Sequence, residues 1–131
     1  MAGIYVDTSA LGRVVLGEPD AQVIRARLAQ FDPWFASELL VVELRRLGVR
    51  EGVLPQAERT LAAVNLVPLT RALLERASRL DPVEVRSLDA IHMCTAVDLH
   101  SAGSIAAVLT YDLQFQAGCA HHGIPVEAPT P

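Results

Sequence analysis

The chain has 131 residues, of which 51% are hydrophobic and 20% are charged. It is long enough for one domain with a buried core and too apolar to be disordered. All 11 basic residues are arginine, and 15 acidic residues give a formal net charge of −4. This balance argues against a protein that binds nucleic acid or membrane surfaces by bulk electrostatics, because such proteins carry a basic excess.

Short β-prone runs alternate with longer helix-like runs, a pattern typical of an α/β domain with a parallel sheet. The predicted strands cover residues 3–6, 33–36, 66–69 and 106–109, with a short edge strand at 124–126. The predicted helices cover residues 10–16, 19–30, 38–50, 55–64, 71–80 and 88–101, with a last helix after Asp112 that ends at 121–123. Three polar residues are expected to be helix N-caps: Ser37, Thr70 and Ser87.

No linker divides the chain, so we expect a single domain over residues 1–127 and a short, loose tail at 128–131. Cys94 and Cys119 do not form a C-x-x-C motif, which argues against a disulfide scaffold. No apolar stretch approaches the ~20 residues of a membrane span, and Asp7 comes too early for a signal peptide. We therefore expect a cytoplasmic protein with no membrane association.

Two predicted strands run directly into an aspartate. Asp7 follows the first strand and Asp112 follows the fourth. Ligands of open parallel sheets bind beyond the carboxyl ends of the strands, which makes both residues candidates for a site. Each also precedes a helix, so helix capping alone is the alternative interpretation.

Glu43 lies inside the apolar stripe of its predicted helix. With Leu40 taken as zero, Glu43 is at about 300°, between Leu39 at about 260° and Leu47 at about 340°. A buried, unpaired carboxylate is costly unless it meets a cation or becomes neutral. The geometry leaves a ligand role and a solvated surface position equally open.

Asp89 lies in the first turn of its predicted helix, where a negative side chain complements the helix dipole. That structural interpretation suffices by itself. Together with Asp7, Glu43 and Asp112, however, Asp89 completes a set of four acids. Carboxylate oxygens without cysteine or histidine suit hard cations such as Mg²⁺ or Mn²⁺ better than zinc.

Other side chains near these acids receive more modest interpretations. Arg86 is a candidate for contact with a phosphate or a carboxylate. His92 lies one turn after Asp89, and partial burial at the helix surface is favoured over a ligand role. A set of aliphatic residues is expected to be core: Leu80, Leu88, Ile91, Leu99 and Leu113.

Four segments in order along the chain resemble the PIN-domain ribonucleases, and within them the VapC toxins of bacterial toxin–antitoxin pairs. The segments are residues 4–11 with Asp7, 41–44 with Glu43, 86–92 with Asp89, and 110–112 with Asp112, followed by Phe115 and by Gly123-Ile124-Pro125. One position departs from many relatives, which carry a further acid where this chain has Gln114. That departure puts a second metal ion in more doubt than the first.

The resemblance implies a PIN-like three-layer sandwich, in which a central parallel sheet of about five strands is flanked by helices. It implies an endoribonuclease that depends on Mg²⁺ or Mn²⁺ and cleaves single-stranded or looped RNA. It also implies a homodimer and a cognate antitoxin as a protein partner. The alternatives are a housekeeping PIN-type nuclease that processes RNA and a catalytically silent binding module of the same fold.

The expected site follows from the resemblance and from the chemistry of phosphodiester hydrolysis, in which a carboxylate-held metal ion activates water and neutralises charge. Asp7 and Asp89 are expected to hold the better-occupied ion, and Glu43 and Asp112 to complete the site directly or through water. Ser9, Thr110 and Arg86 are expected to orient these groups or to contact substrate.

Overall fold

The computed structural model describes all 131 residues and contains one sheet of five strands in the order β3-β2-β1-β4-β5. Every neighbouring pair is parallel, as predicted. The strands are β1 (Gly3–Val6), β2 (Trp34–Ser37), β3 (Asn65–Val67), β4 (Ile105–Leu109) and β5 (Val126–Glu127).

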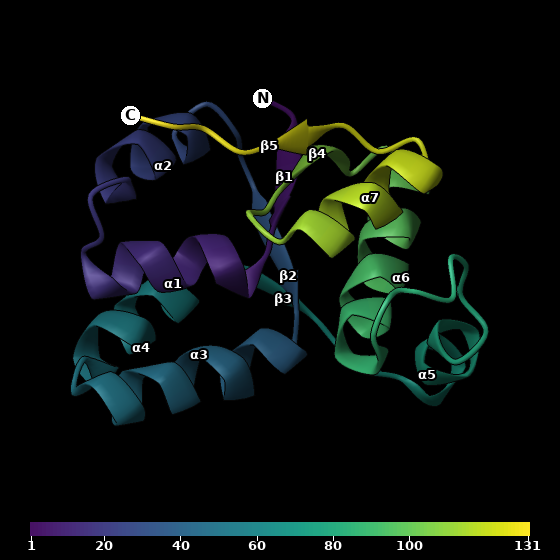
Figure 1. Ribbon diagram of the computed structural model, residues 1–131, viewed down its shortest axis with the longest axis horizontal. Helices are drawn as coiled ribbons and strands as arrows, with labels where there is room; N and C mark the ends of the chain where they lie inside the picture. Colours follow the sequence, from purple (N-terminus) through teal and green to yellow (C-terminus); the bar gives the residue numbers. More distant parts are fainter.

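Seven helices cover the two faces of the sheet, which gives the three-layer sandwich (Figure 1). The helices α1 to α4 lie on one face and α5 to α7 on the other. Their bounds are α1 (Thr8–Leu16), α2 (Ala21–Leu28), α3 (Leu39–Glu51), α4 (Leu54–Ala62), α5 (Arg71–Ala77), α6 (Ser87–Ser101) and α7 (Leu113–His121). None of these helices has the length and apolar character needed to cross a bilayer.

The apolar sequence of β1 agrees with its complete burial. Ile4, Tyr5 and Val6 have no exposed surface, as expected for a parallel strand covered by helices on both faces. Gly17 follows α1 with φ at 67°, a left-handed conformation that glycine adopts without steric cost, and it ends the helix as predicted.

The predicted helix caps have different outcomes. Thr70 caps α5, since its hydroxyl accepts a hydrogen bond from the Leu73 amide at 3.1 Å. Ser37 lies in β2 rather than at the first position outside α3, although its hydroxyl accepts from the Leu39 amide at 3.1 Å. The prediction for Ser87 is wrong, because Ser87 is already inside α6 and no side chain caps that helix.

The strand order places the topological switch point between β1 and β4. From β1 the chain adds β2 and β3 on one side, and it then adds β4 and β5 on the other. A crevice outside the carboxyl ends of these two central strands is the common ligand position in open α/β sheets. Asp7 directly follows β1, and Asp112 lies three residues beyond the end of β4.

The expected loose tail is held at one point. The Tyr111 hydroxyl donates a hydrogen bond to the carbonyl of Pro129. Upstream of it, Glu127 in β5 forms an ion pair with Arg27 of α2 at 3.5 Å. These contacts keep the end of the chain against the body of the domain (Figure 1).

Candidate functional site

Asp7 is a buried carboxylate that does not cap the helix it precedes. Asp7 is only 5% exposed, and its side chain accepts no hydrogen bond from a backbone amide in the first turn of α1. Instead, its Oδ2 accepts hydrogen bonds from the hydroxyls of Ser9 and Thr110, each at 2.8 Å. The interpretation of Asp7 as a simple helix cap is therefore wrong.

Backbone amides orient the hydroxyls of Ser9 and Thr110 so that both donate to Asp7. The Ser9 hydroxyl accepts a hydrogen bond from the Tyr111 amide at 3.0 Å, and the Thr110 hydroxyl accepts one from the Asp112 amide at 3.1 Å. Each hydroxyl therefore has its own proton left to donate to the carboxylate. This network holds Oδ2 of Asp7 and leaves its Oδ1 without a hydrogen bond from the protein.

Asp112 does cap a helix, as one of its two interpretations predicts. Its Oδ1 accepts a hydrogen bond from the Phe115 amide at 3.0 Å at the start of α7. Its second oxygen makes no hydrogen bond within the protein. The capping role and a ligand role are therefore compatible in this residue.

Glu43 faces inward from α3, as its place in the apolar stripe predicts. Its side chain is 25% exposed, and its Oε1 accepts hydrogen bonds from Thr8 at 2.8 Å and from Nε2 of His92 at 2.6 Å. Burial acts to raise the pKa of Glu43, but the hydrogen bonds from His92 and Thr8 outweigh it, so the pKa lies below its usual value. Glu43 is thus held as a carboxylate.

The pKa of Asp89 responds to the charges of the other acids. Burial raises its pKa above the usual value, and repulsion from Asp112, Asp7 and Glu43 raises it further. The charges of the other three acids therefore act on Asp89. In Figure 1 the first turns of α1, α3, α6 and α7 lie around the carboxyl ends of β1 and β4.

Arg86 lies next to two of these acids. With Asp89, Asp112, Leu113 and Gln114 it lines a cavity of about 340 Å³. Arg86 is exposed and forms no ion pair within the protein, so its guanidinium is accessible to an anionic ligand. At position 114, where many relatives carry a further acid, the neutral amide of Gln114 lines this cavity and adds no negative charge.

Two leucines that were predicted to be core residues are exposed. Leu88 is 53% exposed and Leu113 is 79% exposed, so neither belongs to the core. Both occupy the first turn of a helix, on the side turned away from the sheet. Apolar character alone did not distinguish these two positions from true core positions.

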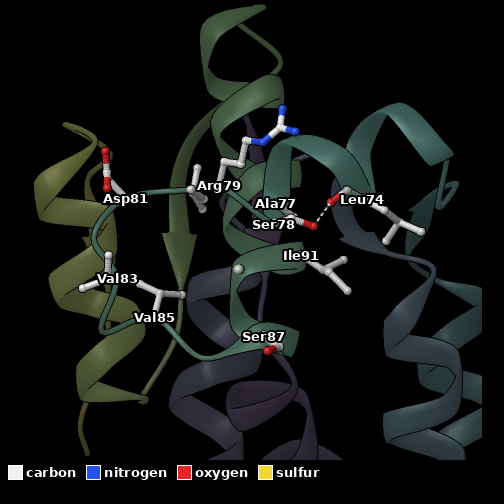
Figure 2. A pocket seen from close by; sticks show the side chains of 11 residues that line it. Leu74, Ala77, Ser78, Arg79, Asp81, Val83, Val85, Ser87 and Ile91 are labelled. Atoms are coloured by element: carbon white, nitrogen blue, oxygen red, sulfur yellow. Dashed lines mark hydrogen bonds between the residues drawn. The ribbon is translucent and has the colours of Figure 1, made fainter.

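A larger cavity of about 400 Å³ lies between α5, the following loop and α6 (Figure 2). Its wall on α6 is formed by Ser87, Ala90 and Ile91, whereas Asp89 and His92 point from the opposite side of that helix toward the acids. The lining is mostly apolar and contains none of the four acids. This cavity is separate from the acidic site.

The acidic residues fit the chemistry of a hard divalent cation. Asp7, Glu43 and Asp112 each have one oxygen bound by the protein and one that is not. No three acidic, histidine or cysteine side chains lie close enough together to bind one ion directly. Mg²⁺ commonly takes one or two carboxylates and keeps several waters, so this set of donors suits it.

Sequence reasoning missed part of the network. Tyr5 received no functional interpretation, and partial burial was favoured for His92, which is only 1% exposed. The Tyr5 hydroxyl and Nδ1 of His92 are hydrogen bonded to each other. A tyrosine within a fully buried strand was the available signal, because a buried hydroxyl needs a partner.

Two comparisons with known proteins agree on one family. A family model described as PIN domain matches residues 4–119, a span that includes all four acids. The chain is 34% identical to Ribonuclease VapC47 of Mycobacterium tuberculosis, with 96% of each protein covered. It is 33% identical to Ribonuclease VapC46 of the same species, over 99% of this chain and 100% of that protein.

One solved structure has the same fold. The crystal structure of Mycobacterium tuberculosis VapC20, described as a sarcin-ricin loop cleaving toxin, matches with a TM-score of 0.65 at 23% identity. The match covers 87% of this chain and 93% of that chain. It extends the likeness from sequence to the arrangement of helices and strands.

Proposed function

Because this chain belongs to the PIN domain family and to its VapC ribonucleases, we propose that it is a metal-dependent endoribonuclease. Its proposed substrate is single-stranded or looped RNA, and its proposed role is that of the toxin in a toxin–antitoxin pair. The observation that supports this proposal is that Asp89 and Asp112 line one cavity beyond the carboxyl end of β4, next to the central strand β1 that Asp7 follows.

The four carboxylates have distinct proposed roles. Asp7 and Asp89 would hold a Mg²⁺ or Mn²⁺ ion, and Glu43 and Asp112 would complete the site directly or through water. When bound, such an ion supplies an activated water and neutralises charge at the phosphorus. Asp7 is suited to this role because Ser9 and Thr110 fix its orientation and leave Oδ1 available.

Arg86 has a proposed role in binding the substrate. Its exposed guanidinium lies in the cavity with Asp89 and Asp112, where it can pair with a phosphate through two parallel hydrogen bonds. A positive side chain beside Asp89 and Asp112 would also compensate part of the repulsion that an incoming phosphate meets. RNA would thus be held at a few points rather than by a basic surface.

The partners and the compartment are part of the same proposal. We infer that the protein acts in the cytoplasm as a homodimer and is inhibited by a cognate antitoxin. An arginine of the antitoxin could pair with the acidic residues, since guanidinium and carboxylate groups match in geometry. The relatives named as VapC ribonucleases support the ribonuclease part of the proposal.

Replacing Asp7 by asparagine tests the site. We expect Asp7→Asn to slow Mg²⁺-dependent cleavage of an RNA hairpin by more than about 100-fold, since loss of an outer partner of a metal ligand already costs 10–100-fold. The measurement is the single-turnover cleavage rate of the purified proteins. Asp98→Asn is the matched control, because Asp98 pairs with Arg76 at the surface of α6, and this variant should cleave like the parent.

Two results would contradict the proposal in different ways. If Asp7→Asn cleaves as fast as the parent, the assignment of the site is wrong. If the parent itself cleaves no RNA with either metal, the chain is a silent binding module of the PIN fold.

A further inference from the structure

A buried series of hydrogen bonds runs from the end of β2 to the acidic site. The Ser37 amide bonds to the Tyr5 hydroxyl at 3.1 Å, the Tyr5 hydroxyl bonds to Nδ1 of His92, and Nε2 of His92 bonds to Glu43 at 2.6 Å. Tyr5 and His92 are 0% and 1% exposed. Three elements, β1, β2 and α6, therefore meet behind one carboxylate of α3.

Counting donors gives this series a direction. A backbone amide can only donate, so the Tyr5 oxygen accepts from Ser37. The single proton of the Tyr5 hydroxyl then has Nδ1 of His92 as its acceptor. A histidine that accepts at Nδ1 carries its proton at Nε2, and this nitrogen donates to the carboxylate of Glu43.

The same hydrogen bonds fix the orientation of Glu43. Its Oε1 receives protons from both His92 and Thr8, at 2.6 and 2.8 Å. Its Oε2 receives none from the protein and is left for the site. A long, flexible glutamate side chain on a helix would otherwise sample several rotamers.

We propose that His92 is a positioning residue that holds Glu43 in place, with its tautomer set by Tyr5 and Ser37. The inference rests on the proposed function, because Glu43 is one of the four acids assigned to the metal site. His92 itself contacts neither substrate nor metal in this proposal. It acts only through the orientation of the Glu43 carboxylate.

Two substitutions at position 92 separate positioning from packing. His92→Leu fills the space but removes both hydrogen bonds. His92→Gln provides an amide that can donate to Glu43 and an oxygen that can accept from Tyr5. Tyr5→Phe is a milder variant that removes one hydroxyl and keeps the ring, should the leucine variant fail to fold.

The readouts are the Mn²⁺ concentration that gives half-maximal thermal stabilisation, and kcat and KM for RNA cleavage. We expect His92→Leu to raise that Mn²⁺ concentration and to lower kcat by about 10–100-fold each, with KM for RNA little changed. His92→Gln should recover most of both losses. Tyr5→Phe should change them in the same direction as His92→Leu, but less.

Thr95→Val is the matched control for a buried polar change on α6. Thr95 is 1% exposed, and its hydroxyl bonds only to the Ile91 carbonyl within the helix. This variant should leave Mn²⁺ affinity, kcat and KM unchanged. Equal losses in Thr95→Val and His92→Leu would show a general effect of disturbing α6 and would overturn the inference.

A double-mutant cycle shows whether His92 acts through Glu43. In a Glu43→Ala background, His92→Leu should have no further effect on the half-maximal Mn²⁺ concentration. The same loss in both backgrounds would overturn the inference. Because Mn²⁺ stabilisation needs no cleavage, a parent that binds Mn²⁺ but cleaves no RNA refutes only the proposed function, and the binding data still decide the role of His92.

Discussion

At the residue scale, the position of Asp89 near other acids lowers the stability of the fold. Burial and the repulsion of Asp112, Asp7 and Glu43 raise its pKa above the value it has in an unfolded chain. The folded state therefore binds the Asp89 proton more tightly than the unfolded state does. Ionised Asp89 consequently destabilises the fold at neutral pH, and this loss disappears as the pH falls through the raised pKa.

We expect Asp89→Asn to raise the melting temperature at pH 7 in EDTA, because it removes one of the repelling charges. The gain over the parent should shrink as the pH is lowered, since the parent then protonates Asp89. Thermal unfolding from neutral to acidic pH measures this. Asp98→Asn loses a surface ion pair instead and should show no such gain, whereas a lower melting temperature for Asp89→Asn at pH 7 would contradict the repulsion.

At the element scale, two helical glycines differ in what surrounds them. A Cβ atom on Gly48 of α3 would lie 2.9 Å from Cα of Leu54 and 3.1 Å from Cβ of Ala57, which is too close. A Cβ atom on Gly12 of α1 would meet only Leu47, at 3.5 Å, an ordinary contact. Gly48 thus permits the close approach of α3 and α4, and Gly12 serves no comparable purpose.

The two alanine variants should therefore change stability in opposite directions. We expect Gly48→Ala to lower the free energy of unfolding by about 1–3 kcal/mol through overpacking. Gly12→Ala should raise it by up to about 1 kcal/mol, because alanine favours the helix more than glycine does. Urea titration measures both, and equal effects of the two variants would contradict the packing argument.

At the scale of the whole molecule, the net charge of −4 equals in number the four acids of the proposed site. Apart from the four acids at the switch point, the chain has 11 acidic residues, which equals its 11 arginines. This agrees with a protein that approaches RNA through bound metal and a few arginines, with no basic surface.

Divalent cations should accordingly stabilise the fold. A Mn²⁺ concentration 100 times the dissociation constant would add about 2.7 kcal/mol to the free energy of unfolding by mass action. Thermal unfolding with MnCl₂, compared with NaCl at equal ionic strength, measures this. Asp98→Asn should respond like the parent and Asp7→Asn should not, and a parent indifferent to Mn²⁺ would contradict a metal site.

The sequence by itself determined the fold class and the candidate acids. Alternating short and long apolar runs predicted a parallel sheet, which the structure confirms. Asp7 and Asp112 stood out because each follows a strand, and Glu43 because of its helical angle. These signals are local, since strand ends and helical periodicity are properties of neighbouring residues.

Only the tertiary structure decided which side chains meet. The hydrogen bond between Tyr5 and His92 joins residues 87 positions apart, and that between Thr8 and Glu43 joins residues 35 apart. The apolar character of Leu113 likewise gave no sign that its side chain is exposed. Such contacts depend on how helices pack onto the sheet, and periodicity within one element does not specify the partner that its side chains face across the core.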